Sequence, residues 1–272
     1  MARARADQAT PADVMRRWQQ DRFVRPAACD PRRVAVVEAR LWQLLPAGFT
    51  GVELSPVTPL GTCTAVAPVS QNRIVATVRT SEVVSDSTNA LAVEAAVRRR
   101  GQPKDGHADL ACCHRQLRAQ VFGPGAAAHF RLFALVSSAR DRGSGRTEAS
   151  LLTRHLAYWL DVLETLLPHR QPRIELSVFG NPVIAERVTD TVRPGLGERT
   201  AFLVDKPGRP HGRGYYTGAA LRITADAGET ELGDGGLTTW TAQLIHDAKE
   251  RCLVSCLATE RLTALAGELS WQ

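Results

Sequence analysis

Two arginines at the ends of apolar segments are the residues of this sequence best suited to chemistry. Arg261 follows Glu260 directly after the apolar run at 252–258, and Arg118 follows a second apolar run that begins at Leu110. Each run predicts a buried strand, and an arginine at its end needs an anionic partner, because an unpaired charge resists desolvation. Guanidinium groups bind phosphate oxygens in a bidentate manner. The pattern therefore predicts that both arginines hold one polyphosphate, and it makes nucleotide chemistry the leading hypothesis.

The same two arginines have a second interpretation as members of structural ion pairs. Glu260 is the neighbour of Arg261 in the sequence, and Glu250 lies at the other end of the same apolar run. Either carboxylate is able to neutralise Arg261 without any ligand. The sequence leaves this alternative open.

Composition sets the class of protein. The chain has 272 residues, of which 44% are hydrophobic and 23% charged, which is ordinary for a globular protein of one or two domains. No apolar run approaches the roughly 20 residues of a membrane helix. The N-terminus is basic but has no apolar signal region. We therefore expect a cytoplasmic protein that does not enter a membrane.

Charge and cysteine usage leave the partners open. The net charge of +6 permits contact with RNA, but an arginine-rich solvated surface accounts for it equally well. The six cysteines form no CxxC pair, and the histidines do not cluster near them. We expect buried, reduced thiols rather than a zinc site, so no residue is assigned as a metal ligand.

Hydrophobic periodicity predicts helices that alternate with strands, some of them paired as hairpins, and hence an α+β fold with a mixed or antiparallel sheet. Residues 1–30 are expected to form a basic N-terminal extension and residues 31–272 one domain. The predicted helices are 32–45, 88–100, 147–167, 182–192 and 238–249. The predicted strands are 51–56, 73–78, 110–113, 117–122, 130–137, 173–179, 200–204, 215–224 and 253–258.

The order of short motifs resembles the catalytic core of class II aminoacyl-tRNA synthetases. Residues 53–56 (Glu-Leu-Ser-Pro) are similar to motif 1 of that family. Residues 117–120 (Leu-Arg-Ala-Gln), followed by Phe133, are similar to motif 2. Residues 257–262 (Leu-Ala-Thr-Glu-Arg-Leu) are similar to motif 3. Each motif alone is weak, and the order of the three gives the resemblance its specificity.

Three connecting segments narrow the resemblance to histidyl-tRNA synthetase. Residues 175–182 (Glu-Leu-Ser-Val-Phe-Gly-Asn-Pro) resemble its strand-to-helix signature. Residues 214–218 (Gly-Tyr-Tyr-Thr-Gly) resemble its tyrosine-pair motif, and residues 233–237 (Gly-Asp-Gly-Gly-Leu) resemble its glycine-rich turn before motif 3. The resemblance extends from about residue 32 to the C-terminus. It implies an antiparallel sheet flanked by helices.

The resemblance implies an ATP- and Mg²⁺-dependent site. Arg118 would bridge the α-phosphate and a carboxylate, and Arg261 would hold the γ-phosphate. Phe133 would stack on adenine, although a plain core aromatic is the alternative. The implied catalytic residues are Arg118, Arg261 and Arg213; the implied ATP-binding residues are Arg118, Gln120, Phe133, Glu260 and Arg261; the implied substrate-binding residues are Asp86, Thr88, Tyr215, Tyr216 and Gly235.

Two of these substrate assignments carry alternatives. Asp86 is expected to bind an α-amino group, or else only to precede the N-cap of the helix at 88–100. If Tyr215 and Tyr216 alternate across a strand, only one of them faces a pocket.

Several segments depart from the family pattern. We expect no anticodon-binding domain, and only a short segment precedes Tyr215 where the family has an inserted domain. Gln120 stands where the family has glutamate. Residues 211–214 (His-Gly-Arg-Gly) replace the family's Arg-Gly-Leu-Asp, so Arg209 or Arg213 would have to take the place of its catalytic arginine.

The expected amino-acid pocket also differs. Residues 134–138 (Ala-Leu-Val-Ser-Ser) stand where the family has polar and acidic readers of the imidazole, and residues 85–88 (Ser-Asp-Ser-Thr) replace Arg-Pro-Glu-Gly-Thr. A pocket without polar readers discriminates poorly for a polar side chain. We expect a smaller or more apolar amino acid, or none.

The resulting hypothesis is an enzyme that activates an amino acid or another small carboxylate as an acyl-adenylate. The acyl acceptor would be a carrier protein, a small amine or the acceptor end of a tRNA, and the resemblance implies a homodimer with Pro56 at its interface. The alternatives are a non-catalytic paralogue, like the regulatory subunit of ATP phosphoribosyltransferase, and an RNA-binding module that uses the basic N-terminus.

Overall fold

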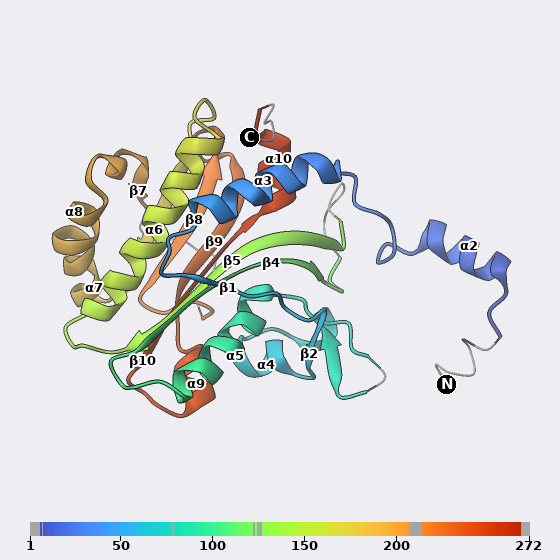
Figure 1. Ribbon diagram of the computed structural model, residues 1–272, viewed down its shortest axis with the longest axis horizontal. Coiled ribbons are helices and arrows are strands. Elements are labelled where there is room, and N and C mark those ends of the chain that lie inside the picture. Colours follow the sequence, from blue (N-terminus) through green and yellow to red (C-terminus); the bar gives the residue numbers. More distant parts are fainter. Residues whose placement is uncertain are drawn as a thin grey trace.

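An eight-stranded mixed sheet forms the centre of the computed structural model, which describes residues 6, 8–77, 79–121, 123, 127–206 and 214–267. The strands lie in the order β1-β4-β5-β10-β9-β8-β6-β7, and a separate two-stranded sheet is formed by β2 and β3 (Figure 1). The outermost pairs, β1 with β4 and β6 with β7, are parallel, and the other pairs are antiparallel. The predicted α+β architecture is confirmed.

The strands differ widely in length, and the longest lie towards the middle of the sheet. Their bounds are β1 (Thr50–Gly51), β2 (Val57–Pro59), β3 (Ser81–Val83), β4 (His107–Leu117), β5 (His129–Arg140), β6 (Arg173–Val178), β7 (Leu203–Asp205), β8 (Ala219–Ala225), β9 (Thr230–Thr238) and β10 (Glu250–Ala258).

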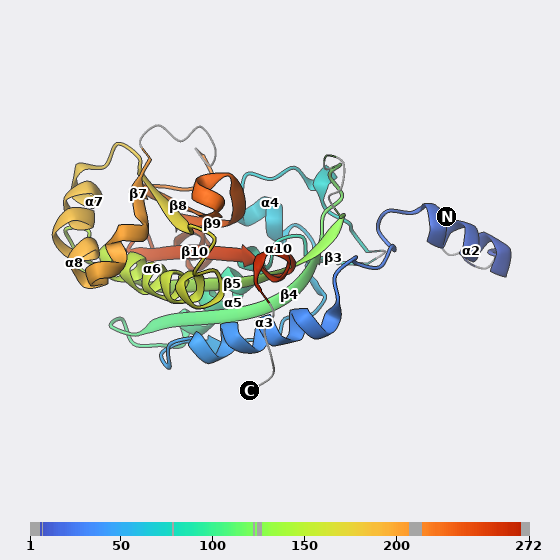
Figure 2. The same cartoon turned by 90° about the horizontal axis from the view of Figure 1, so that it is seen from above.

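Helices cover both faces of the sheet (Figures 1 and 2). One face is covered by α3 (Pro31–Leu44), α6 (Arg146–Leu166), α7 (Pro182–Arg187), α8 (Arg193–Leu196) and α10 (Thr259–Leu265). The other is covered by α4 (Thr62–Val66), α5 (Ser87–Arg100) and α9 (Trp240–Ile245). Four further turns are η1 (Gln71–Arg73), η2 (Val188–Val192), η3 (Gly197–Phe202) and η4 (Asp226–Gly228). Within the described ranges, no helix is both long and apolar enough to span a bilayer.

The core on the α6 face contains a buried polar network around His155. Its two ring nitrogens lie 2.8 Å from Oγ of Ser255 and 2.9 Å from Oγ of Ser137, and Trp159 Nε1 donates to the same Ser255 oxygen. Burial lowers the pKa of His155 to about 3. The imidazole is therefore neutral in the folded protein, and the network orients β5, β10 and α6 relative to one another.

The helix α2 (Pro11–Gln20) stands apart from the rest of the molecule in both views (Figures 1 and 2). None of its residues is buried, and Trp18 is 53% exposed. The segment after it is attached to the body by Arg22, whose guanidinium donates to the backbone carbonyls of Ala119 and Gln120. The basic segment is thus connected to the loop that follows β4.

Most predicted elements are present, with shifted ends. The helices at 32–45, 88–100 and 147–167 correspond to α3, α5 and α6, and the apolar run at 252–258 is β10 leading into α10. Several short elements are wrong. Residues 73–77 form a turn and one isolated bridge rather than a strand, and β4 ends at Leu117 instead of restarting there.

The most consequential error concerns residues 233–237, which were predicted to be a turn and form the middle of β9. A Cβ atom on Gly233 would lie 2.0 Å from the Cys256 carbonyl oxygen, and one on Gly235 would lie 2.5 Å from Ser255 Cβ. The glycines are there because β9 approaches β10 and Tyr216 too closely for side chains.

We predict that Gly235→Ala destabilises the protein by about 1–3 kcal/mol, because the added methyl group overpacks the contact with Ser255. Urea unfolding monitored by tryptophan fluorescence measures this. Gly48→Ala is the matched control, since a Cβ atom there meets nothing within 4 Å. Equal unfolding free energies for the two variants would contradict the close-approach explanation.

Candidate functional site

A cavity of about 330 Å³ opens on the α5 face of the sheet, beyond the end of β4. Six of the predicted site residues line it: Asp86, Thr88, Arg118, Gln120, Tyr215 and Tyr216. Its remaining lining residues are Cys63, Val69, Arg73, Ile74, Ser85, Asn89, Asp234, Val254, Ser255 and Cys256. Segments that are far apart in the sequence therefore meet at this site.

Arg118 and Asp86 form an ion pair in the cavity wall. Arg118 Nη2 lies 3.3 Å from Asp86 Oδ2, and its Nε donates to the Ser85 carbonyl at 3.0 Å. The guanidinium carbon also lies 5.2 Å from the ring centroid of Phe130. About 29% of the Arg118 side chain is still exposed, so its remaining N–H groups can reach a ligand. The contacts fix the arginine without using all of its donors.

Asp86 is itself the N-cap of α5, whereas the sequence predicted the cap at Thr88 or Asn89. Its Oδ1 accepts hydrogen bonds from the backbone N–H and the hydroxyl of Thr88, at 3.0 and 2.7 Å. The other oxygen, Oδ2, faces Arg118 and the Tyr215 hydroxyl. The two predicted roles of Asp86 are therefore compatible, because each uses a different oxygen.

Tyr215 and Tyr216 both line the cavity, so the expectation that only one of them faces a pocket is wrong. The two residues precede β8 and do not alternate across a strand; their rings meet edge to face with centroids 4.9 Å apart. Burial, followed by the charges of Asp86 and Asp234, holds the pKa of Tyr215 well above its usual value. Its phenol remains a protonated hydrogen-bond donor.

The thiols near the cavity are unreactive. Burial raises the pKa of Cys256 well above its usual value, and the charges of Asp234 and Asp86 raise it further. Burial also raises the pKa of Cys63 to about 11. Because the thiolate is the nucleophilic form, neither cysteine is suited to covalent chemistry near neutral pH.

Phe133 is not an adenine platform. It is fully buried on the opposite face of the sheet, with ring centroids 4.7 Å from Trp42 and 5.9 Å from Tyr158. The core interpretation, kept as the alternative, is the right one. Phe130 lies an odd number of residues earlier on β5 and therefore occupies the cavity face, where it contacts Arg118.

The predicted two-arginine clamp is not assembled in this structure. Arg261 does not line the cavity; it donates instead to the backbone carbonyl of Glu231. Glu260 points to the α3 side and binds Arg115, with the Cys29 thiol 3.4 Å from its Oε1. Glu260 and Arg261 therefore both have protein partners in this structure, and neither faces the cavity.

The assignment of Gly235 also changes, and that of Arg213 stays a prediction. Gly235 lies against Ser255 and is not among the residues that line the cavity. Arg213 and Arg209 lie outside the described residues.

Asn89, Arg73 and Asp234 also line the cavity and were not predicted from the sequence. Asn89 is fully buried on α5 beside the Tyr215 phenol. A polar amide in an alanine-rich helix was the available signal for it. Asp234 was not predicted as a cavity residue because its segment, which forms part of β9, was assigned to a turn.

No family model matches the sequence, and no curated protein is detectably similar to it. Solved structures do match its fold. An ATP phosphoribosyltransferase regulatory subunit/histidyl-tRNA synthetase from Bacillus halodurans has a TM-score of 0.68 at 12% identity, over 90% of this chain and 83% of that chain. Apo S. aureus histidyl-tRNA synthetase gives 0.65 at 13% identity, over 88% and 68%. A histidine–tRNA ligase subunit from Alicyclobacillus acidocaldarius gives 0.62 at 14% identity, over 89% and 96%.

The fold is that of a class II aminoacyl-tRNA synthetase core. The resemblance inferred from motif order is thereby confirmed at the level of the fold. The synthetase-like core brings together residues of the predicted motif 2 and tyrosine-pair segments at one cavity, and it places the Glu260–Arg261 segment outside that cavity.

We predict that Asp86→Ala destabilises the fold by about 1 kcal/mol more than Asp86→Asn does. Asparagine still accepts the Thr88 N–H bond that caps α5, whereas alanine does not. Urea unfolding of both variants measures the difference. Equal losses would show that capping by Asp86 contributes nothing to stability.

We also predict that the unfolding free energy falls as the pH drops below about 6.5. The neutral His155 has a pKa of about 3 when folded, against 6.5 as its ordinary value, so between those values the unfolded chain binds the extra proton. From pH 6.5 to 5 this amounts to about 2 kcal/mol. Urea unfolding at pH 7.5 and 5 should show a smaller loss in His155→Gln than in the native protein, whereas the exposed control His169→Gln should match the native protein. The same loss in all three would rule out His155 as the cause.

Proposed function

We propose that the chain binds a small α-amino acid and ATP in the 330 Å³ cavity and joins them as an aminoacyl-adenylate. The observation that supports it most directly is the presence of both signs of charge in the cavity wall. The Arg118 guanidinium pairs with Asp86, the Tyr215 phenol donates to the same carboxylate, and Asp234 lines the same cavity. A zwitterion matches this arrangement, with its carboxylate at Arg118 and its ammonium group at Asp86.

The size of the cavity favours a small substrate. Trp240 packs against Tyr215 with ring centroids 5.3 Å apart, and it is only 2% exposed. Beyond it, the space is filled by a buried network in which Ser138 donates to Thr241 and Glu250, while Arg99 pairs with Glu250 at 2.8 Å. This packing leaves little room for a long side chain, in line with the expectation of a smaller amino acid.

The residues present fit a nucleotide in part. Arg118, Arg73 and the Gln120 amide offer donors at the cavity, and Phe130 offers an aromatic ring beside Arg118. Among the described residues, no group of three or more His, Cys, Asp or Glu side chains is placed to hold a metal ion. Mg²⁺ would therefore enter as a complex with ATP, with Asp86 and Asp234 as the nearby carboxylates.

ATP with Mg²⁺, when bound, supplies an electrophilic α-phosphorus. In the proposed reaction a carboxylate oxygen of the amino acid forms a bond to that phosphorus, and pyrophosphate leaves. Arg118 stabilises negative charge on the carboxylate and the phosphoryl oxygens, while Asp86 and Tyr215 fix the ammonium group. In the proposed reaction these residues act by positioning and charge. No covalent intermediate on a cysteine is invoked, because burial raises the pKa of the neighbouring Cys256 thiol and keeps it protonated.

Exchange of labelled pyrophosphate into ATP across the twenty amino acids tests this proposal. Exchange with one or a few small amino acids is expected, and Arg118→Ala should reduce it about 100-fold or more. The control is Arg142→Ala, an exposed arginine at the opposite end of β5 that does not line the cavity. Exchange that is absent with every amino acid, or that survives Arg118→Ala, would refute the proposal.

A non-catalytic regulatory subunit is the second candidate, and one observation favours it. Glu260 and Arg261, the residues expected to reach the triphosphate, are both engaged elsewhere, by Arg115 and by the Glu231 carbonyl. Under this proposal, calorimetry would detect amino-acid binding that Arg118→Ala abolishes, while exchange is absent, and the chain would change the rate of a partner enzyme. The acyl acceptor, whether carrier protein or tRNA acceptor end, and a homodimer remain further parts of the first proposal.

A further inference from the structure

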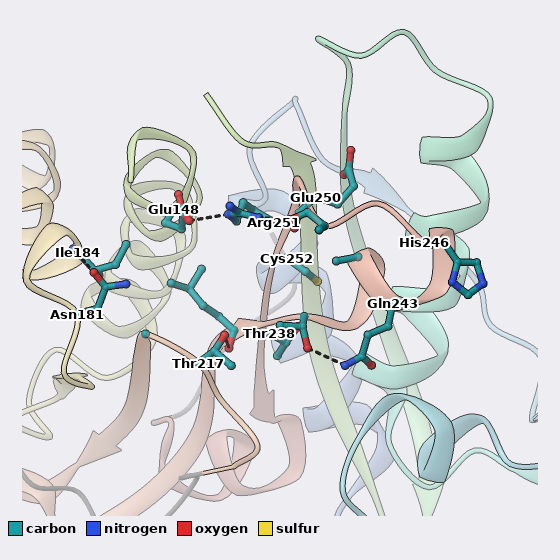
Figure 3. A pocket seen from close by; sticks show the side chains of 15 residues that line it. Glu148, Asn181, Ile184, Thr217, Thr238, Gln243, His246, Glu250, Arg251 and Cys252 are labelled. Carbon is teal, nitrogen blue, oxygen red and sulfur yellow. Dashed lines mark hydrogen bonds and ion pairs between the residues drawn. The ribbon is translucent and has the colours of Figure 1, made fainter. Parts of the chain in front are cut away.

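A second cavity, of about 650 Å³, lies at the other end of β10 from the proposed active site. It shares no lining residue with the smaller cavity. Figure 3 shows Glu148 of α6 and Asn181 and Ile184 at the start of α7 on one side, with Gln243 and His246 on the other. The floor between them is formed by the end of β9 and the start of β10.

The walls of this cavity are largely apolar, with polar side chains both near Glu148 and on the opposite side, at Gln243 and His246. Ile184, Leu237, Ala242 and Cys252 supply apolar surface. Pockets of this size and character, with a few placed polar groups, are typical of small-molecule sites.

Protein acceptors occupy most of the donors of the arginine in the wall. Arg251 Nε donates to Glu148 at 2.8 Å and Nη2 donates to Asp141 at 2.8 Å. Its Nη1 donates to the carbonyls of Ala248 and Glu250. These bonds use all but one N–H of the guanidinium, so the arginine itself has little capacity left for an anion.

Glu148 supplies an acceptor. Its Oε1 binds Arg251, whereas Oε2 is buried and has no hydrogen-bond partner within the described residues. Oγ1 of Thr238, in a residue that is 5% exposed, also lacks a partner of normal geometry there and lies beside the weakly polar Cys252 thiol. A buried carboxylate oxygen without a partner is unfavourable, and a donor brought to this carboxylate relieves that cost.

The charges nearby favour a cation. Glu148, which lines the cavity, and Asp141, which lies behind Arg251 and does not line it, share the single guanidinium of Arg251, so these three residues together carry one negative charge in excess. Glu250, the other carboxylate in the wall, is already paired with the buried Arg99. A positively charged donor would balance the excess.

We propose that this cavity binds a small organic cation, a primary amine with a short apolar body, whose ammonium group donates to the Glu148 carboxylate. The apolar part would lie against Ile184, Leu237 and Ala242. This inference does not depend on the adenylation proposal, because it concerns binding in a different cavity.

The position of the cavity suits an effector site. Residues 250–252 of β10 line the large cavity, and residues 254–256 of the same strand line the smaller one. Thr217 and Gly218 line the large cavity directly after Tyr216, which lines the smaller. Two stretches of backbone, β10 and residues 216–218, therefore connect an amine bound at Glu148 to the proposed amino-acid site.

Calorimetric titration of the full chain, without ATP, tests the proposal with a panel of primary amines from ethylamine to phenethylamine. Carboxylates of the same skeletons serve as charge-reversed probes. Amines are expected to bind and carboxylates not, and hydrogen exchange should slow at residues 238–252. Glu148→Gln should weaken amine binding at least about tenfold. The control Glu186→Gln, an exposed carboxylate on α7 outside the cavity, should not.

A filling variant keeps the test decisive if Glu148→Gln unfolds. Ala242→Phe occupies the cavity from α9, and it should abolish amine binding while the protein keeps its cooperative thermal transition. The proposal is overturned if amines fail to bind at about 10 mM, if carboxylates bind equally well, if binding persists in both variants, or if a crystal soaked with the amine holds only water at Glu148.

Discussion

The alternation of side chains along β10 is the constraint on which the rest of the structure depends. Cys252, Val254 and Cys256 face the α5 side, where they border the two cavities, while Leu253 and Leu257 face the core under α6. Ser255 joins the core network through His155. Because β10 pairs with β5 on one side and β9 on the other, its register determines which residues of all three strands reach a ligand.

Charge is distributed differently in the two cavities. In the smaller one, a partly exposed Arg118 faces Asp86 and keeps donors available, so both signs of charge are presented to a ligand. In the larger one, protein acceptors take all but one N–H of Arg251, and one carboxylate oxygen of Glu148 has no hydrogen-bond partner among the described residues. The two sites therefore favour different chemistries, a zwitterion in one and a cation in the other, although a single strand connects them.

The fold class could be predicted from the sequence because it depends on long periodic segments such as α3, α6 and β10. The hydrophobic pattern of these segments identifies them even where their ends, or the short elements between them, are assigned wrongly. Six of the residues that line the candidate cavity followed from the family resemblance, and Asp86, Arg118 and Tyr215 are among them. Face assignment on β5 failed for Phe133, since composition does not tell which side of a strand is core. Arg261 and Glu260 were misplaced because backbone carbonyls and neighbouring arginines, invisible in the sequence, provided their partners.

The glycine-rich stretch of β9 has a consequence for how this site can change over time. A Cβ atom on Gly236 would lie 2.5 Å from the ring of Tyr216, so the aromatic side chain rests directly on bare backbone. The same Cβ atom would also lie 2.7 Å from the backbone carbonyl oxygen of Ala219, so a smaller residue at 216 alone would not make room for a side chain at 236. The shape of this part of the cavity can therefore change through residue 216, while position 236 is held to glycine by the backbone around it.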